Sequence, residues 1–274
     1  MTANLDGETL LYPILGDPIA QVKSPGLLSA ILARRGVNGL VVPMHVAAVD
    51  YPAVIGALKA TGNVRGLIAT VPHKGATLAL CDAPSERARF AGSINVMHRR
   101  DDGTWEGDNT DGQGFLNGVA AKGFDIAGTR ALLIGVGGAG AAIAYEILAR
   151  GAAFLAIHDL DAGRRNATIA RLEAAFPGRV GAGGTDPRGF DFVGNATPVG
   201  MRPDDPLPVE AEHYEPRQFV ADCITRPAET PQLRIAHERG CGTMPGLGMF
   251  EAQAELLVDR VTGRTGEPPA TDAA

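Results

Sequence analysis

Short apolar runs alternate along the chain with longer stretches in which apolar residues recur every three or four positions. Runs at residues 9–15, 39–46 and 65–71 predict strands. The stretches between them, 24–36 and 50–62, carry an apolar face and end at glycine, which is typical of helices. Strand, helix, strand, helix and strand in this order predict a parallel sheet with helical crossovers.

Beyond residue 72 the pattern loses its regularity and then recovers it. Residues 75–80 predict a short helix, 86–89 predict no clear element, and 93–98 with 104–106 predict a hairpin around Asp101-Asp102-Gly103. Later runs at 131–134, 153–157, 179–183, 190–193 and 219–224 predict strands. Helices are expected at 115–121, after 140, at 162–175, 229–239 and 246–261, with a surface loop at 201–215 and a frayed tail at 267–274.

The clearest motif joins the predicted strand at 131–134 to the helix after it. Gly135-x-Gly137-x-x-Gly140 follows that strand directly. In this position Gly135 permits a tight turn, Gly137 lets the backbone approach a pyrophosphate, and Gly140 lets the helix pack closely on the strand. The helix start then offers unpaired amides and a positive dipole to the phosphates. The stretch predicts a dinucleotide site, with an unliganded glycine-rich turn as the alternative.

The polar loop at 108–112 marks the expected domain boundary, because a chain of 274 residues is long for one core of ~100–150 residues. The fold class that follows is α/β. We expect an N-terminal parallel αβ domain over 1–110 and a Rossmann-type, doubly wound dinucleotide-binding domain over 111–246.

Two polar positions at strand ends bear on the cofactor. A carboxylate at Asp159 would accept hydrogen bonds from the ribose hydroxyls and repel a 2′-phosphate, which favours NAD over NADP. Arg164 and Arg165 lie close by and could accommodate that phosphate, so NADP stays possible. Asn195 to Thr197 follow a strand at the edge where ligands bind, although an ordinary Asx turn is the alternative.

Composition and charge limit the classes of partner that the protein is expected to bind. A net charge of −6 without a basic block argues against nucleic acid or an anionic membrane, and no apolar run approaches the ~20 residues of a membrane span. Cys81, Cys223 and Cys241 are widely spaced, which argues against a metal site or a disulfide framework and favours a reducing cytoplasm. The first residues lack the pattern of a secretory signal. We expect a small-molecule substrate, and the sequence leaves monomer and homodimer open.

Catalytic candidates are the polar residues at predicted strand ends in the first domain: Thr70, Lys74, Asn95, Asn109 and Asp111. Oxidation of an alcohol needs a proton acceptor, and a neutral lysine amine can serve. Asp111 could hold the substrate hydroxyl and orient Lys74. Taken singly, each is more often a solvated charge than a catalyst, and His73 competes as a base or as a structural residue.

Seven segments form a wider pattern that keeps its order from about residue 14 to 254. They are Gly16-Asp17-Pro18-Ile19 with Ser24-Pro25, Thr70-Val71-Pro72-His73-Lys74, Ser93-Ile94-Asn95, Asn109-Thr110-Asp111-Gly112 with Gly114-Phe115, Gly135 to Ala139, Asn195-Ala196-Thr197-Pro198 with Gly200-Met201, and Gly246 with Met249 and Gln253-Ala254. This pattern resembles the motifs of the shikimate dehydrogenase family, which includes quinate/shikimate dehydrogenases.

The resemblance implies a role for each matched residue. Lys74 and Asp111 would form the catalytic pair. Substrate would be bound by Ser24, Thr70, Asn95 and Gln253, and the cofactor by Gly135, Gly137, Gly138, Ala139, Asp159, Thr197, Ile224, Gly246 and Met249. It also implies that the last helix, 247–274, returns to complete the substrate domain, with catalysis in the cleft between the domains and no metal.

Some positions depart from the family pattern. Val22 stands where the family has a serine and Gln21 where a histidine is common, while Ile68 replaces an asparagine and Thr225 a tyrosine. Three of these changes remove donors expected around a substrate carboxylate, and each lost charge-assisted bond weakens binding by ~1.5–3 kcal/mol. Either Lys23 or Arg226 replaces those donors, or the substrate is not shikimate itself.

The sequence therefore predicts an oxidoreductase that transfers a hydride between a nicotinamide cofactor, preferably NAD, and a ring hydroxyl of shikimate, quinate or a related hydroxylated cyclic acid. The alternatives are a dehydrogenase whose substrate lacks the usual carboxylate contacts, and a catalytically weak dinucleotide or metabolite sensor.

Overall fold

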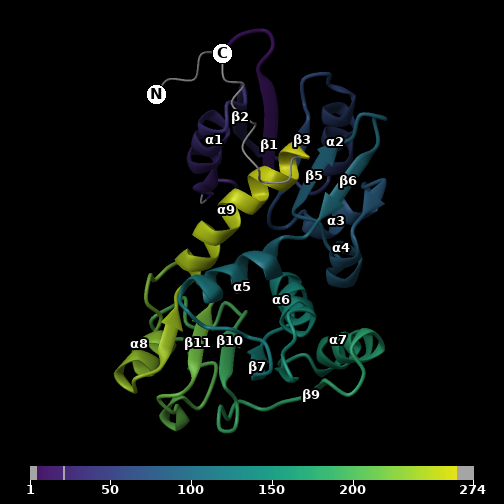
Figure 1. Ribbon diagram of the computed structural model, residues 1–274. Coiled ribbons are helices and arrows are strands. Elements are labelled where there is room, and N and C mark those ends of the chain that lie inside the picture. The colour runs from purple at the N-terminus through teal and green to yellow at the C-terminus, as the bar shows by residue number, and fades with distance from the viewer. Residues whose placement is uncertain (1–4, 21, 264–274) are drawn as a thin grey trace, which may run out of the picture. The chain divides into compact units, whose positions relative to one another are not determined.

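The computed structural model describes residues 5–20 and 22–263, so position 21 and the predicted tail at 267–274 lie outside the described residues. Contacts divide the chain into two compact units, Met1–Thr110 with Ala254–Ala274, and Asp111–Gln253 (Figure 1). The sequence prediction gave all of 247–274 to the first domain. In the structure the last helix is shared, since its residues up to Gln253 group with the second unit.

The first unit is built on one six-stranded sheet in the order β2-β1-β3-β5-β6-β4. Its strands are β1 Leu10–Gly16, β2 Gly39–His45, β3 Gly66–Ala69, β4 Ala83–Pro84, β5 Val96–Arg99 and β6 Trp105–Asp108. Its helices are α1 Ser24–Arg34, α2 Tyr51–Ala60, α3 Lys74–Ala79 and α4 Glu86–Ala91. β1, β2 and β3 run parallel, whereas β5 pairs antiparallel with both β3 and β6. The β5–β6 pair confirms the predicted hairpin.

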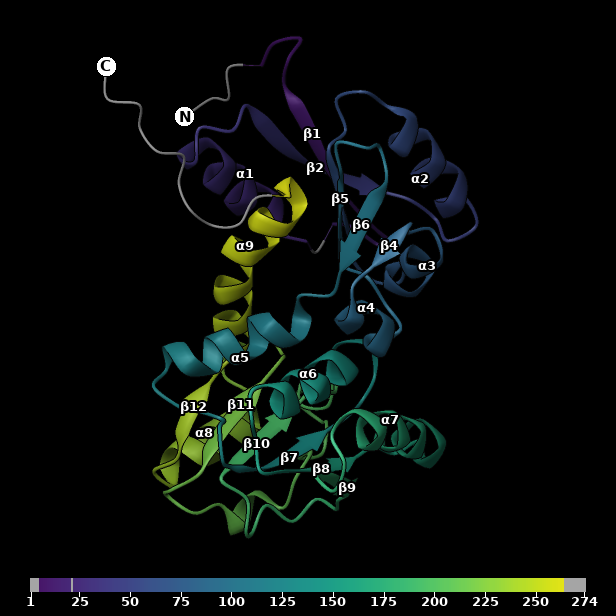
Figure 2. The same cartoon turned by 45° about the vertical axis from the view of Figure 1, so that its right-hand side comes forward.

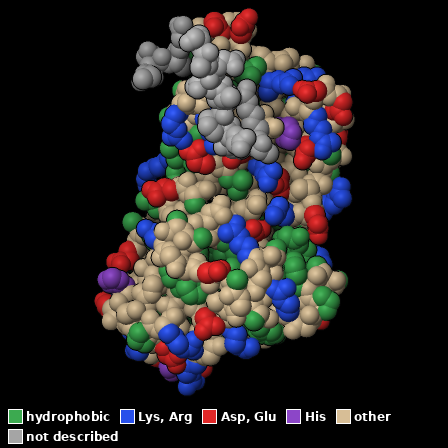
Figure 3. Space-filling view, in the orientation of Figure 1, with side chains coloured by type: hydrophobic (Ala, Val, Ile, Leu, Met, Phe, Trp, Pro, Cys, Tyr) green, Lys and Arg blue, Asp and Glu red, His purple; other side chains and the backbone are tan. Residues whose placement is uncertain are grey.

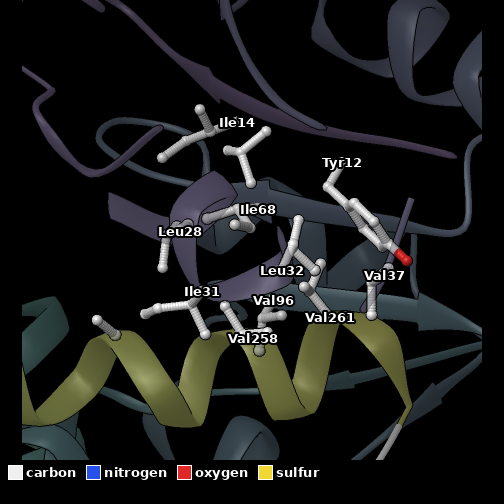
Figure 4. Packing of buried hydrophobic residues seen from close by; sticks show 12 residues of the cluster. Tyr12, Ile14, Leu28, Ile31, Leu32, Val37, Ile68, Val96, Val258 and Val261 are labelled. Atoms are coloured by element: carbon white, nitrogen blue, oxygen red, sulfur yellow. The ribbon is translucent and has the colours of Figure 1, made fainter. Parts of the chain in front are cut away.

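The C-terminal part of α9 (Gly246–Thr262) packs into the core of this unit. Figure 4 shows Val258 and Val261 on α9 directed toward Ile68, Val96 and Leu32. The approach is close, because a Cβ added at Gly66 would lie 2.2 Å from the carbonyl oxygen of Val261. Arg34, the last residue of α1, and Arg35 directly after it also pair with Glu255 and Asp259 of α9.

The second unit has a parallel six-stranded sheet in the order β12-β11-β10-β7-β8-β9. Its strands are β7 Arg130–Ile134, β8 Phe154–His158, β9 Val180–Ala182, β10 Phe192–Asn195, β11 Phe219–Asp222 and β12 Gly242–Met244. Its helices are α5 Asp111–Ala121, α6 Gly138–Ala149, α7 Ala162–Ala175, α8 Pro231–Glu238 and the 3₁₀ turn η1 Ala211–His213. Figure 2 shows α5 and α6 side by side, and Gly112 permits this, since a Cβ there would lie 2.3 Å from the Ala142 carbonyl. Strand order reverses between β7 and β10, as in a doubly wound Rossmann-type sheet.

Several local predictions were incomplete or wrong. Helix α4 forms where the pattern gave no element, because Ser85 caps it by accepting a hydrogen bond from the Ala88 amide. The proline-rich stretch at 201–215 is not only a surface loop, since Val209 and Tyr214 are buried in the core of the second unit.

Charged side chains of both signs are interspersed on the face that Figure 3 shows. Within the described part of the chain, no helix combines the length and the apolar character needed to cross a membrane.

Candidate functional site

The glycine loop lies at the carboxyl end of β7, and close contacts require glycine at two of its positions. Gly135 has φ +88°, a conformation that favours glycine, and a Cβ on it would lie 2.4 Å from the Thr197 methyl group. A Cβ on Gly140 would lie 2.2 Å from the Gly135 carbonyl oxygen, so α6 can pack on the loop only without a side chain there. Gly137 and Gly138 meet nothing within 4 Å, which leaves space beside the start of α6. This open helix start suits the phosphates of a dinucleotide.

Asp159 follows β8 and is held by a network of donors. Its carboxylate accepts hydrogen bonds from the amides of Val136 at 2.8 Å and Asp161 at 2.9 Å. The Arg164 guanidinium donates two more, at 2.8 and 3.1 Å. Burial by itself raises the pKa of Asp159, but the bonds from Arg164 and the two amides outweigh it and lower the pKa to about 2. The carboxylate therefore fixes the glycine loop and stays ionised at neutral pH.

The other residues assigned to the cofactor gather near the ends of β10, β11 and β12. Asn195 does form an Asx turn, because its Oδ1 accepts the amide and the hydroxyl of Thr197 at 3.1 and 2.7 Å. Ile224 follows β11, and its carbonyl accepts the amide of Gly246 at 3.2 Å. A Cβ on Gly246 would lie 2.4 Å from that carbonyl oxygen, and Met249 lies one turn further along α9.

In the first unit the backbone fixes Lys74 and Asn95 next to each other. Lys74 is the first residue of α3, and its carbonyl accepts the amide of Ile94 at 2.9 Å. Asn95 is buried, and it exchanges hydrogen bonds with Thr110, whose amide reaches its Oδ1 at 3.0 Å. The structure therefore brings the predicted base and a predicted substrate residue to the same end of the sheet.

His73 is buried and holds the start of α3. Its ring stacks on Tyr51 with centroids 4.0 Å apart, and its Nε2 lies 2.7 Å from the Val46 carbonyl oxygen. A carbonyl only accepts, so Nε2 carries a proton and donates it. The Tyr51 hydroxyl bonds to Thr77, which donates to the His73 carbonyl at 2.8 Å. His73 therefore supports Lys74 rather than competing with it.

Thr70 directly follows β3, which pairs with β1, and Ser24 is the first residue of α1. The Thr70 amide donates to the Leu15 carbonyl at 2.9 Å, and its methyl group lies so close to Gly16 that a Cβ there would be 2.6 Å away. Ser24 is buried at the start of α1. Both residues stay predicted substrate contacts.

Asp111 and Gln253 are brought together within the second unit, which the sequence did not indicate. Asp111 begins α5 and is buried, and its Oδ1 accepts a hydrogen bond from Gln253 Nε2 at 3.0 Å. Gly114, one turn along α5, gives room for Gln253, since a Cβ there would lie 2.7 Å from the Gln253 Cβ. The two residues lie 142 positions apart in sequence, so only the fold could reveal the pair.

Two of the positions that depart from the family pattern lie in apolar surroundings. Ile68 is buried in the core of the first unit, and Val22 packs against that same core. Thr225 and Arg226 are exposed, and so is Lys23, which lies just before α1. Gln21 lies outside the described residues.

One group of described side chains has possible ligand atoms close enough to one another to hold a cation. Ligand atoms of Asp186, Glu210 and His213 lie within 4.8 Å of one another. Arg188 already donates to both carboxylate oxygens of Asp186, so ion pairing accounts for the group.

A parallel α/β sheet with a glycine loop and a strand-end aspartate defines the class as a dinucleotide-dependent oxidoreductase. The family model for the shikimate dehydrogenase substrate-binding domain matches residues 14–97. A shikimate dehydrogenase (NADP(+)) of Rubrobacter xylanophilus is 37% identical over 251 residues, 88% of this chain and 87% of the relative. The chain belongs to the shikimate dehydrogenase family, as its motifs predicted, and is an NAD(P)-dependent enzyme.

Two solved structures share the whole fold. Shikimate 5-dehydrogenase from Listeria monocytogenes, in complex with shikimate and NAD, has a TM-score of 0.88 at 26% identity and covers 98% of this chain and 96% of its own. Ligand-free 5-ketofructose reductase of a Gluconobacter strain has a TM-score of 0.85 at 31% identity and covers 95% of each chain.

The lowered pKa of Asp159 predicts an acid-dependent contribution to stability. The pKa rises from about 2 in the folded chain toward 3.8 on unfolding, so the contribution is complete above pH 3.8 and is lost as the pH falls toward 2. We expect Asp159→Asn to lose about 1–2 kcal/mol of unfolding free energy at pH 6, and the gap to wild type to narrow below pH 4. Urea unfolding between pH 3 and 6 measures it.

Asp161→Asn is the matched control, because asparagine also caps a helix and Asp161 caps α7 through the Arg164 amide. A gap between wild type and Asp159→Asn that stays constant with pH would contradict the ionic role.

Proposed function

We propose that the chain oxidises a ring hydroxyl of shikimate, quinate or a related hydroxylated cyclic acid, and reduces the corresponding ketone in the reverse direction. The observation that carries this proposal is the pair of fixed polar groups in a chain of this family. Lys74 begins a helix beside buried Asn95, and buried Asp111 is held by Gln253.

The chemistry divides between the cofactor and these side chains. A bound nicotinamide supplies the acceptor or the donor of the hydride. In the oxidative direction the neutral amine of Lys74 takes the hydroxyl proton while the hydrogen on the same carbon leaves as hydride, and a C=O bond forms. Asp111 accepts a hydrogen bond from the substrate hydroxyl and so holds it in position. Gln253 keeps the Asp111 carboxylate oriented.

We further propose that NAD is preferred over NADP. An ionised Asp159 at the end of β8 accepts hydrogen bonds from ribose hydroxyls and repels a 2′-phosphate. Arg164 is engaged with that carboxylate by two hydrogen bonds, so recruiting it for a phosphate would break them. The curated relatives, that of Rubrobacter among them, are named for NADP(+), and the Listeria structure holds NAD, so the proposed preference for NAD rests on Asp159 itself.

Lys74→Ala should lower kcat with shikimate or quinate by about 10²–10⁴-fold, because it removes the proton acceptor. Steady-state assays with each cofactor measure it. Lys122→Ala removes an exposed lysine of the second unit and serves as the control. Unchanged turnover in Lys74→Ala on a substrate that wild type uses would refute the assignment.

Wild type should show a higher kcat/KM with NAD than with NADP. Asp159→Ala should reduce that ratio by tenfold or more, since a charge-assisted hydrogen bond is worth ~1.5–3 kcal/mol. Asp161→Asn should keep the ratio of wild type. Faster turnover of NADP by the wild-type enzyme would overturn the preference.

A second candidate is a hydroxylated substrate that carries no carboxylate. It is favoured by the apolar surroundings of Val22 and Ile68, because a carboxylate beside them would lack donors and be costly to desolvate. The Gluconobacter neighbour, which shares this fold, is named as a reductase of 5-ketofructose and not as a shikimate or quinate dehydrogenase. The hydroxyl chemistry of Lys74 and Asp111 would be unchanged.

Restoring donors separates the two candidates. Ile68→Asn with Val22→Ser should raise kcat/KM for shikimate by tenfold or more if missing carboxylate donors limit its use. Kinetics on shikimate, quinate and a neutral ketose test this, with Ile14→Val as a core-only control in the same cluster. The neutral substrate would be ruled out by two results together. These are an efficient wild-type enzyme on shikimate or quinate, and a double variant whose kcat/KM for both acids is no higher.

A further inference from the structure

Three polar side chains with no part in the proposed reaction are buried together at the carboxyl end of the sheet in the second unit. Asp222 and Asn195 are the last residues of β11 and β10 and lie opposite each other in the parallel register. Thr230 caps α8 and is also buried. Asp222 and Asn195 both have 0% exposure, so no water contact accounts for their polarity.

The Asp222 carboxylate is the centre of this cluster. It accepts hydrogen bonds from the Ile224 amide and the Thr230 hydroxyl, both at 2.9 Å. The Asn195 amide group lies 3.3 and 3.4 Å from its two oxygens. One carboxylate therefore joins the end of β10, the loop after β11 and the first turn of α8.

These contacts lead directly to the residues assigned to the nucleotide. Asn195 holds Thr197 through its Oδ1 and the Val199 carbonyl through its Nδ2 at 3.1 Å. Ile224, held by Asp222, accepts the Gly246 amide. Thr197 in turn lies against Gly135 of the glycine loop. Each of these nucleotide residues lies one to three contacts from Asp222.

Burying the Asp222 carboxylate costs free energy of folding, which argues that the cluster does more than stabilise the fold. Burial raises the pKa of Asp222, and the hydrogen bonds from Ile224, Thr230 and Asn195 offset this only in part. Among the residues that the structure describes, no lysine, arginine or histidine pairs with this carboxylate. Well-packed apolar residues would be cheaper here, and buried polar groups can instead specify a single geometry.

We propose that Asp222 is a positioning residue for the dinucleotide: it sets the loops that carry Thr197 and Ile224 against the glycine loop. The inference rests on the proposed nucleotide role of these residues. Asp222 itself contacts no reacting atom, so its loss should act on nucleotide affinity.

Two substitutions disturb the cluster with little change in shape. Asp222→Asn places an amide donor where Asn195 and Thr230 already donate, and Thr230→Val removes the hydroxyl. Thr230→Ser keeps the hydroxyl as the conservative variant. Phe219→Leu is the control for lost stability, because Phe219 is buried at the opposite end of β11 and stacks on Phe124.

Calorimetric titration with NAD⁺ and with NADP⁺, at a temperature where every variant is folded, measures the effect. We expect Asp222→Asn to weaken binding by tenfold or more and Thr230→Val by about fivefold, while Thr230→Ser and Phe219→Leu bind as wild type does. In assays the KM for the nucleotide should rise in the same order, and kcat at saturation should stay within about twofold.

The outcomes separate this inference from the proposed function. Wild-type affinity in both Asp222→Asn and Thr230→Val overturns the positioning role alone. So does an equal loss in Phe219→Leu, since general destabilisation would then explain the effect. If Asp222→Asn does not fold, the Thr230→Val and Thr230→Ser pair decides. A wild-type protein that binds neither nucleotide overturns the proposed function together with this inference.

Discussion

The second unit depends on one constraint: where parallel strands end, the backbone must turn, and its amides need acceptors away from bulk water. Side chains at the strand ends meet this need. Asp159 accepts the amides of Val136 and Asp161, Asn195 accepts that of Thr197, and Asp222 accepts that of Ile224. The same bonds that complete the fold therefore shape the edge at which a parallel sheet binds its ligand. Stability and recognition cannot be varied independently there.

Much of the fold of the second unit could be predicted from the sequence, because glycine motifs and strand patterns depend on neighbouring residues. The βαβ unit around Gly135 needed only neighbouring residues. The hydrogen bond between Asp111 and Gln253, and the alignment of Asn195 with Asp222, needed the tertiary fold and the strand register. Helix α4 was missed because its stability comes from the Ser85 cap and not from a long apolar face.

The first unit shows how a shared backbone can accommodate different side chains. The backbone around Lys74 and Asn95 is fixed by main-chain bonds, which tolerate changes in nearby side chains. Val22 and Ile68 instead extend the apolar core. A site of this kind can keep its handling of a hydroxyl while it exchanges the group that it recognises at the other end of a substrate. Resemblance in motifs therefore identifies the reaction more securely than the substrate.

The division of α9 has a consequence for how the chain is made. Residues 111–253 are continuous in sequence, so the second unit can collapse as soon as they have left the ribosome. The first unit is interrupted by that whole segment, and Val258 and Val261 complete its core only after the segment has been made. Until then the apolar surface around Ile68 and Val96 lacks the part of its cover that α9 supplies. Residues 5–110 thus precede the second unit in the chain but complete their core after it.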